Sequence, residues 1–165
     1  MIETNRLILI PLTANQLSLL ANEITKLEQE LDFTYKAEPM EGFFRDIVNS
    51  QAEKSRNDEA NYLFHTFWLI IRKNDRVAVG SFGFKGIPNN GGEVEIGYGL
   101  GKAFEGNGYM TESILALYSW SKTRAEISYL IAETEPDNPQ SENVLKRCNF
   151  VLYRKDENGN SWWKL

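Results

Sequence analysis

The stretch that decides the fold is Glu93–Trp120, which reads EVEIGYGLGKAFEGNGYMTESILALYSW. Apolar side chains alternate with polar or small ones over its first part, which predicts a strand with one buried face. From Met110 onward apolar residues recur at helical spacing, which predicts a helix. Gly106 and Gly108 lie between the two and allow a tight turn that brings the backbone close to a ligand. Because the first turn of a helix has unpaired N–H groups and a partial positive charge, we expect a diphosphate-binding loop here.

The glycines of this stretch do not follow the two best-known phosphate motifs. A third glycine of the dinucleotide fingerprint is missing, and no Gly-Lys-Ser/Thr triplet is present for a Walker loop. The loop resembles instead the acyl-coenzyme A loop of the GNAT family of N-acetyltransferases, whose motif runs Arg/Gln-x-x-Gly-x-Gly/Ala. The aligned residues are Glu105, Gly106, Asn107, Gly108, Tyr109 and Met110. Glu105 and Met110 depart from the motif, whereas the following Thr111 and Glu112 match the family's Gly-x-Gly-Tyr-x-Thr-Glu run.

The residues before this stretch predict a strand followed by two helices. The strand is expected at 6–12, and Thr13 suits the N-cap of the first helix. Leucine and isoleucine residues recur at spacings of three and four over 17–31, which favours a core-facing helix over a coiled-coil or partner-binding one. Pro39 suits the first position of the second helix. The polar segment 51–60 predicts a frayed helix end or an exposed loop.

The remaining segments predict two hairpins, a parallel strand and a last helix. The hairpin strands are expected at 67–72, 77–85, 150–155 and 161–165. A strand at 127–133 follows the central helix and is expected to lie parallel to the central strand through a right-handed crossover. Pro139 begins the last helix with Asn138 as its N-cap, which places Ser141 near the helix start on its inner face.

Three more segments resemble one branch of the GNAT family, the branch that includes ribosomal-protein N-terminal acetyltransferases. They are Thr4-Asn5-Arg6-Leu7-Ile8-Leu9, Glu95-Ile96-Gly97-Tyr98, and the helix from Asn138-Pro139-Gln140-Ser141 to Asn149-Phe150. Asn149 stands where the family has glycine, a change that a left-handed C-cap tolerates. The resemblance implies a mixed α/β GNAT fold over 1–165 as a single domain, with a mostly antiparallel central sheet, a splayed parallel pair and about four helices.

Composition limits the classes of partner. The chain has 165 residues, of which 42% are hydrophobic, enough for one domain with a real core. Its net charge of −5 argues against nucleic acid as a partner and suits a cationic acceptor. The longest apolar run, 67–71, is far shorter than the roughly 20 residues that cross a bilayer. With one cysteine and no basic and apolar leader after Met1, we expect a cytoplasmic protein, monomeric or homodimeric.

The resemblance implies direct transfer of an acetyl group from acetyl-coenzyme A to a primary amine, without a metal. Glu95 would take the proton of the amine, although alternating carboxylates also suit a solvated strand face. Ser141 would protonate or position the departing sulfur, or else hydrogen-bond backbone N–H groups at the helix start. A backbone N–H near Leu100 would hold the thioester carbonyl, at a bulge in the family's central strand.

The remaining site residues also follow from the resemblance. The amides from Gly106 to Thr111 would hold the diphosphate, with Asn138 on the facing helix also contacting the cofactor. Phe33, Tyr35 and the rest of the segment between the first two helices would line the acceptor side, with Glu38 nearby, where either a peptide N-terminus or a small cationic amine fits. Leu145 occupies the place of the tyrosine that many GNAT enzymes use as general acid.

Two other side chains and two rival functions complete the expectations. Cys148 and His65 are expected to be structural. Because of the departures at the two ends of the loop motif and the missing tyrosine, a non-catalytic acyl-coenzyme A-binding module is the alternative to an enzyme. A protein-interaction domain without a cofactor is a third reading.

Overall fold

The computed structural model describes residues 1–165 and contains one sheet of nine strands. The strands are β1 (Ile2–Glu3), β2 (Leu7–Pro11), β3 (Thr34–Tyr35), β4 (Phe67–Arg72), β5 (Val77–Phe84), β6 (Glu93–Leu100), β7 (Tyr129–Thr134), β8 (Val151–Lys155) and β9 (Ser161–Lys164). Their order is β1-β2-β4-β5-β6-β7-β9-β8, and β3 pairs with β5 outside this path. Only β6–β7 and β3–β5 are parallel pairs. The predicted mixed α/β fold with a mostly antiparallel sheet is confirmed.

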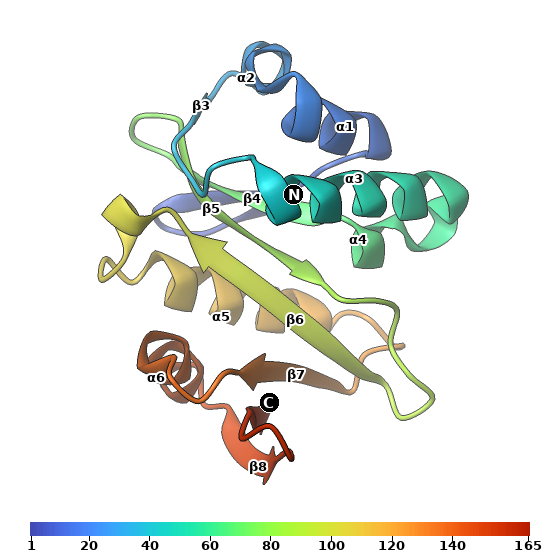
Figure 1. Cartoon of the computed structure of the whole chain (residues 1–165), viewed down its shortest axis with the longest axis vertical. Helices are drawn as coiled ribbons and strands as arrows, with labels where there is room; N and C mark the ends of the chain where they lie inside the picture. The colour runs from blue at the N-terminus through green and yellow to red at the C-terminus, as the bar shows by residue number, and fades with distance from the viewer.

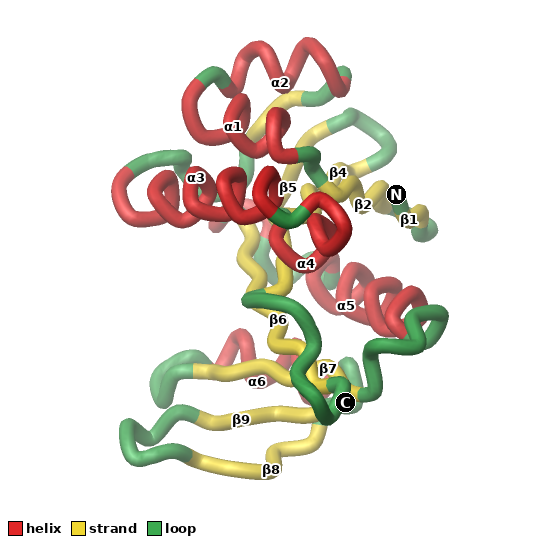
Figure 2. The backbone as a smooth tube through the Cα atoms, turned by 90° about the vertical axis from the view of Figure 1, so that its right-hand side faces the viewer, coloured by secondary structure: helices red, strands yellow, loops and turns green.

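Six α-helices surround the sheet, more than the four expected. They are α1 (Ala14–Asn22), α2 (Ile24–Leu31), α3 (Gly42–Asn57), α4 (Tyr62–His65), α5 (Tyr109–Ser121) and α6 (Pro139–Arg147). Figure 1 shows α1, α2 and α3 at one end of the molecule and α5 behind β6. In Figure 2 the strands β8 and β9 lie at the end remote from α1 and α2. No helix combines the length and the apolar character that a membrane crossing requires.

Three predicted caps are confirmed. The Thr13 hydroxyl accepts a hydrogen bond from the N–H of Gln16 at 3.2 Å, and the Gln16 side chain accepts one from the N–H of Thr13 at 3.0 Å. This reciprocal capping box satisfies two amides that the start of α1 leaves free. Asn138 caps α6, because its side-chain oxygen accepts from the N–H of Ser141 at 3.0 Å. Asn149 has φ of 65°, the left-handed conformation expected after that helix.

Two helix boundaries differ from the prediction in the N-terminal half. Glu23, with φ of −144° and ψ of 54°, interrupts the leucine stripe over 17–31 and divides it into α1 and α2. The spacing conceals this break because apolar residues continue at intervals of three and four across it. The next helix begins at Gly42 rather than Pro39, with Glu41 as its N-cap residue.

The polar segment 51–60 is largely helical, so the prediction of a frayed end or an exposed loop is wrong. Helix α3 continues to Asn57 and buries Ala52 and Ser55. The Ser55 hydroxyl donates to the carbonyl of His65 at 3.1 Å and thereby attaches the helix to α4. A buried face made of small residues gives little apolar periodicity, which explains the error.

The buried side chains form two clusters, one on each face of the sheet. The larger cluster includes Trp68, which stacks on Phe82 with ring centroids 5.6 Å apart and meets Trp120 of α5 edge-on at 5.3 Å. The smaller cluster lies under α1, α2 and α3. Ile70 belongs to the larger cluster and its neighbour Leu69 to the smaller, so β4 is buried on both faces. The sheet is therefore fixed from both sides and can hold loops rigidly at its edges.

Strands β6 and β7 separate after a short paired segment. Their register ends at Glu95 opposite Ile131, whereas β6 continues to pair with β5 as far as Leu100 opposite Gly80. Figure 1 shows the two arrowheads diverging, with α6 next to the widening gap. The predicted splayed parallel pair is thus present, and the gap exposes one edge of β6.

Candidate active site

The loop between β6 and α5 has the geometry of an anion-binding turn. Gly106 and Gly108 have φ of +75° and +76°, in the left-handed region that favours glycine. Gly108 is the N-cap residue of α5. None of the amide N–H groups from Gly106 to Thr111 has a hydrogen-bond partner within the protein. These free donors at a helix start, which also carries a partial positive charge, suit a diphosphate.

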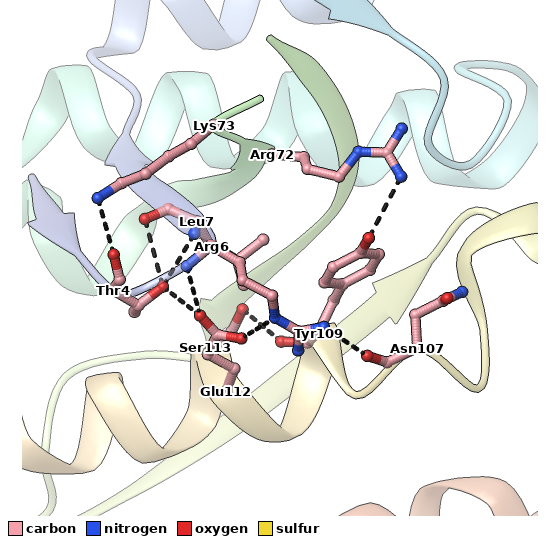
Figure 3. Close-up of polar contacts among 9 residues, drawn as sticks. All are labelled: Thr4, Arg6, Leu7, Arg72, Lys73, Asn107, Tyr109, Glu112 and Ser113. Carbon is pink, nitrogen blue, oxygen red and sulfur yellow. Dashed lines mark hydrogen bonds and ion pairs between the residues drawn. The ribbon is translucent and has the colours of Figure 1, made fainter. Parts of the chain in front are cut away.

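An ion pair from the N-terminus of the chain holds this loop in place (Figure 3). The Glu112 carboxylate accepts hydrogen bonds from the Thr4 hydroxyl at 2.6 Å and from the N–H of Arg6 at 2.9 Å. The Arg6 side chain donates to Glu112 at 2.6 Å through Nε and to the carbonyl of Asn107 at 3.0 Å through Nη1. Partial burial works to raise the pKa of Glu112, but the bonds from Thr4 and Arg6 outweigh it and lower that pKa. The segment at 4–6 and the glycine loop therefore act as one unit.

The two side chains that follow Gly108 point inward rather than toward a ligand. Tyr109 lies under the Arg6 guanidinium, 4.7 Å from its ring centroid, and its hydroxyl accepts from Arg72 Nη1 at 3.2 Å (Figure 3). Met110 is 3% exposed and belongs to the larger core cluster. Both side chains are thus largely buried, and Met110 also lines the cleft beside the loop.

Glu105 places a carboxylate at the mouth of the loop. It lines the adjoining cleft and lies 3.5 Å from Lys102, whose side chain is 90% exposed. A pair as exposed as this one contributes little stability, so Lys102 offsets only part of the negative charge. The Asn107 side chain instead folds the loop on itself, because its amide donates to the carbonyls of Phe104 and Glu105.

A cleft of about 550 Å³ connects this loop to the open edge of β6. The free edge of β6, the loop around Gly106 and the first turns of α6 line it. Lys85 donates its N–H to the carbonyl of Glu95, and Gly101 donates its N–H to the carbonyl of Val79. Because bonding to β5 alternates along an antiparallel strand, the N–H of Leu100 faces the opposite edge, where β7 has already departed.

The predicted bulge in β6 is not observed. The register between β5 and β6 runs from Gly80 to Phe84 without a shift. The free amide at Leu100 results instead from the divergence of β7. The N–H of Leu100 is therefore unpaired, for a different structural reason than a bulge.

Ser141 lies on the far wall of this cleft and contacts a residue that the sequence patterns did not single out. Its hydroxyl is 2.7 Å from the hydroxyl of Tyr98 on β6. Asn138 caps α6, so the hydroxyl of Ser141 is not needed for capping. Asn138 itself also lines the cleft, in agreement with a place beside the predicted ligand. In the sequence Tyr98 belongs to the alternating strand and to the Glu95–Tyr98 segment that resembles the GNAT branch, and neither pattern assigns its side chain a role.

Glu95 lies on the opposite face of β6 from Ile96, as predicted, and forms an ion pair with Lys85. The Glu95 side chain is 20% exposed, and the same lysine lies 3.6 Å from Glu133 of β7. Glu95 is therefore neither a freely solvated carboxylate nor an unpaired one. Any role for it as a base has to include Lys85, which crosses β6 over Gly97.

A second cleft, of about 320 Å³, opens on this face of β6. Phe44 of α3, Phe67 of β4 and Lys85 line it, together with Glu38 from the segment between β3 and α3. The Glu38 carboxylate reaches over Gly99, where a Cβ atom would lie only 3.1 Å from it. The cleft thus combines an aromatic wall with a carboxylate close to the end of β6.

The two residues predicted to line the acceptor side lie elsewhere. Phe33 is 6% exposed and packs in the smaller core cluster, so the prediction that it contacts substrate is wrong. Burial raises the pKa of Tyr35 strongly, with a further increase from Glu38. The Tyr35 hydroxyl donates to the carbonyl of Glu38 at 2.7 Å. Tyr35 therefore holds Glu38 in position without lining the cleft.

Three other side chains lie where the sequence predicts. Leu145 is fully buried, so no acid occupies its place. Cys148 is also fully buried, and desolvation raises its pKa to about 11, which makes it an inert thiol. His65 is 3.0 Å from Asp58 in a hydrogen bond that lowers the pKa of that aspartate. Neither Cys148 nor His65 lines the two clefts.

Comparison with known families decides which class of protein carries this geometry. Residues 6–151 match the model of the acetyltransferase (GNAT) domain. The chain belongs to the GNAT acetyltransferase family. Along its length it is 28% identical to the uncharacterized N-acetyltransferase YjdG of Bacillus subtilis over 163 residues, which cover 98% of this chain and 96% of that protein.

Solved structures of other GNAT proteins share the fold. The ribosomal-protein alpha-N-acetyltransferase RimL in complex with coenzyme A is 22% identical, with 98% of this chain and 94% of that chain aligned and a TM-score of 0.64. The microcin self-immunity acetyltransferase MccE, in complex with acetyl-coenzyme A and AMP, is 21% identical, with 98% and 93% aligned and a TM-score of 0.68. An acetyltransferase named for a ribosomal protein and one named for microcin self immunity thus share this fold.

Proposed function

We propose that this GNAT protein transfers an acetyl group from acetyl-coenzyme A directly to a primary amine. The observation that carries the proposal is the run of free amides at the start of α5, which opens into a cleft along the free edge of β6. In this proposal the amides from Gly106 to Thr111 bind the diphosphate, and the N–H of Leu100 donates to the thioester oxygen as it gains charge. Asn138 lies opposite, on the α6 side of the cleft.

The two clefts meet at Tyr98 and Gly99, which line both of them. An acetyl donor in the first cleft and an amine in the second would therefore approach each other across β6. Bringing two reactants together in the right orientation accounts for a large part of such a rate enhancement. This arrangement favours direct transfer over a covalent acetyl-enzyme, because the one cysteine is buried with a raised pKa.

In this proposal Glu95 takes the proton that the attacking amine must lose. It stands on the same face of β6 as Gly97 and Gly99, along which the acceptor cleft runs. Lys85 pairs with this carboxylate and orients it until a substrate ammonium competes for it. A carboxylate in this place can accept a proton directly or through water.

The acceptor cleft favours a cationic amine attached to an apolar group. Glu38 supplies a carboxylate near the point of transfer, and the rings of Phe44 and Phe67 meet edge-on beside it, with centroids 5.7 Å apart. A peptide amino terminus with an apolar or small first residue has this chemistry, and the name of the RimL relative supports such an acceptor. We therefore propose a peptide or protein N-terminus as the acceptor, ahead of a small free amine.

The test is thiol release from acetyl-coenzyme A with a panel of free peptides, the same peptides with blocked N-termini, and small alkyl and aryl amines. Free peptides are expected to release thiol and blocked ones not. Glu38→Gln should raise the KM for the acceptor about tenfold and leave that for acetyl-coenzyme A unchanged, whereas the matched variant Glu41→Gln should change neither. Turnover of small amines but not of peptides would show that the acceptor is a small amine and not a peptide N-terminus. Binding of acetyl-coenzyme A without any thiol release would indicate a non-catalytic acyl-coenzyme A module.

A further inference from the structure

Tyr98 lies where three hollows of the surface meet. It lines the cleft beside the glycine loop, the acceptor cleft and a third pocket of about 310 Å³ that also contains Ser141 and Glu133. No other residue lines all three. A side chain at this junction faces both the donor and the acceptor, although it belongs to the strand between them.

The Tyr98 hydroxyl makes its hydrogen bonds with Ser141 alone. It lies 2.7 Å from the Ser141 hydroxyl oxygen and 3.3 Å from the Ser141 carbonyl oxygen. Tyr98 is the one protein partner of the Ser141 hydroxyl, and the cap of α6 is supplied by Asn138, which accepts from the Ser141 N–H. The phenol has one hydrogen to donate, and the Ser141 hydroxyl oxygen at 2.7 Å is a nearer acceptor than the carbonyl oxygen at 3.3 Å, so the favoured direction has Tyr98 donating to the hydroxyl. The hydrogen of Ser141 is then free to point into the cleft.

The surroundings keep Tyr98 in its donating form. Burial raises its pKa to about 12, against a smaller lowering by the bond with Ser141. Cys148, on the helix side, raises the pKa further. The other ionisable groups lining the three hollows are Glu38, Lys85, Glu105, Glu133, Glu135 and Arg147. The tyrosine therefore stays protonated throughout the range in which an acceptor amine becomes neutral.

We propose that Tyr98 is a positioning residue that directs the Ser141 hydroxyl toward the sulfur of the departing thiol. The inference rests on the acetyl transfer proposed above. The amine nitrogen bonds to the acetyl carbon, the carbon–sulfur bond breaks, and its electron pair remains on sulfur. Ser141 donates a hydrogen bond to this thiolate while it forms, and solvent supplies the proton after release. Tyr98 of β6 and Ser141 of α6 thus stabilise the thiolate in a site where Leu145 provides no acid.

The two residues must then act as a unit, and a double-mutant cycle measures whether they do. Tyr98→Phe keeps the ring and removes the donor, and Ser141→Ala removes the group that it directs. Each single variant should lower kcat about 10- to 100-fold with both KM values unchanged, since a hydrogen bond to a charged group is lost only as charge develops. The double variant should be no slower than the slower single variant. Tyr129→Phe, a half-exposed tyrosine outside the clefts, is the matched control and should behave as wild type.

Several outcomes would overturn the inference. Additive losses would mean that the two hydroxyls act independently, and a wild-type rate for Tyr98→Phe would remove the tyrosine altogether. A rise in the KM for acetyl-coenzyme A with little change in kcat would show that Tyr98 only holds α6 in place. If wild type releases no thiol with any amine of the panel, the proposed function fails and the inference fails with it. An active wild type together with an unaffected Tyr98→Phe contradicts the inference alone. Melting temperatures of all variants, expected within a few degrees of wild type, check that the fold is retained.

Discussion

The donor loop and the acceptor cleft lie on the same strand but are built in different ways. At the donor loop, the proposed diphosphate site at 106–111, the free groups are backbone amides, and the side chains of Thr4, Arg6 and Glu112 hold the backbone from behind. At the acceptor cleft the chemistry comes from the side chains of Glu38, Phe44 and Lys85, which three separate segments contribute. A backbone site tolerates changes such as Met110, because any residue but proline keeps its N–H. A site made of side chains changes its ligand preference when one of those side chains is substituted.

The largest effect on the backbone site is expected from a substitution at Gly108. Gly108→Val should abolish the binding of acetyl-coenzyme A, because valine strongly disfavours φ of +76° and places a branched side chain where the ligand approaches. The nearest protein atom to a Cβ there, Arg6 Nη2, is 3.5 Å away, so the fold itself should survive. The measurement is the thermal shift with acetyl-coenzyme A, with Gly86→Val as the control outside the loop. Normal binding by the valine variant would place the phosphate site elsewhere.

On the acceptor side the largest expected effect is at Glu95. Glu95→Gln keeps the shape but removes the basicity, so turnover should fall about 10²-fold while the affinity for acetyl-coenzyme A stays constant. The loss should shrink as pH rises, because more of the amine is then already neutral. The pH profile of thiol release for both proteins measures this trend. Equal rates at every pH would leave deprotonation to solvent and make Glu95 a structural partner of Lys85.

The support behind the donor loop should appear as a pH-dependent stability. Glu112→Gln removes an ion pair with Arg6, and we expect a loss of about 1 kcal/mol at neutral pH, since the arginine is partly exposed. The folded pKa of Glu112 is lowered, so its contribution is present above the unfolded value and disappears as pH falls through the folded one. Urea unfolding of both proteins at neutral and acid pH measures the difference. A gap that persists or grows in acid would contradict this assignment.

The smallest expected effect concerns the charge of Glu105. Glu105→Arg should tighten the binding of acetyl-coenzyme A modestly, by up to about 1 kcal/mol, and Glu105→Gln by less, since each removes a carboxylate from beside a diphosphate. Titration calorimetry at low and high salt separates the charge effect, which salt should weaken. Weaker binding in both variants would show that Glu105 orders the loop.

The same contrast explains how much could be predicted from the sequence. The donor loop is encoded locally, by two glycines between a strand pattern and a helix pattern, and the residues named from the motif lie in that loop or in the first turn of α5. On the acceptor side the sequence places Glu38 nearby but not the aromatic residues of the cleft, because Phe33 packs into the core while Phe44 reaches the cleft. The contact between Tyr98 and Ser141 joins residues 43 positions apart, and an alternating strand pattern does not reveal which of its members meets a hydroxyl. Burial and long-range contact decide both cases.

The most direct test of the central claim is thermal unfolding of the wild-type protein with and without acetyl-coenzyme A. If the amides at the start of α5 bind the diphosphate, the melting temperature should rise, because a ligand at 100 times its Kd stabilises the folded state by about 2.7 kcal/mol. For a domain of this size such a gain corresponds to a shift of roughly 5 to 10 °C. An unchanged melting temperature at millimolar acetyl-coenzyme A would contradict both the donor site and the acetyl transfer built on it.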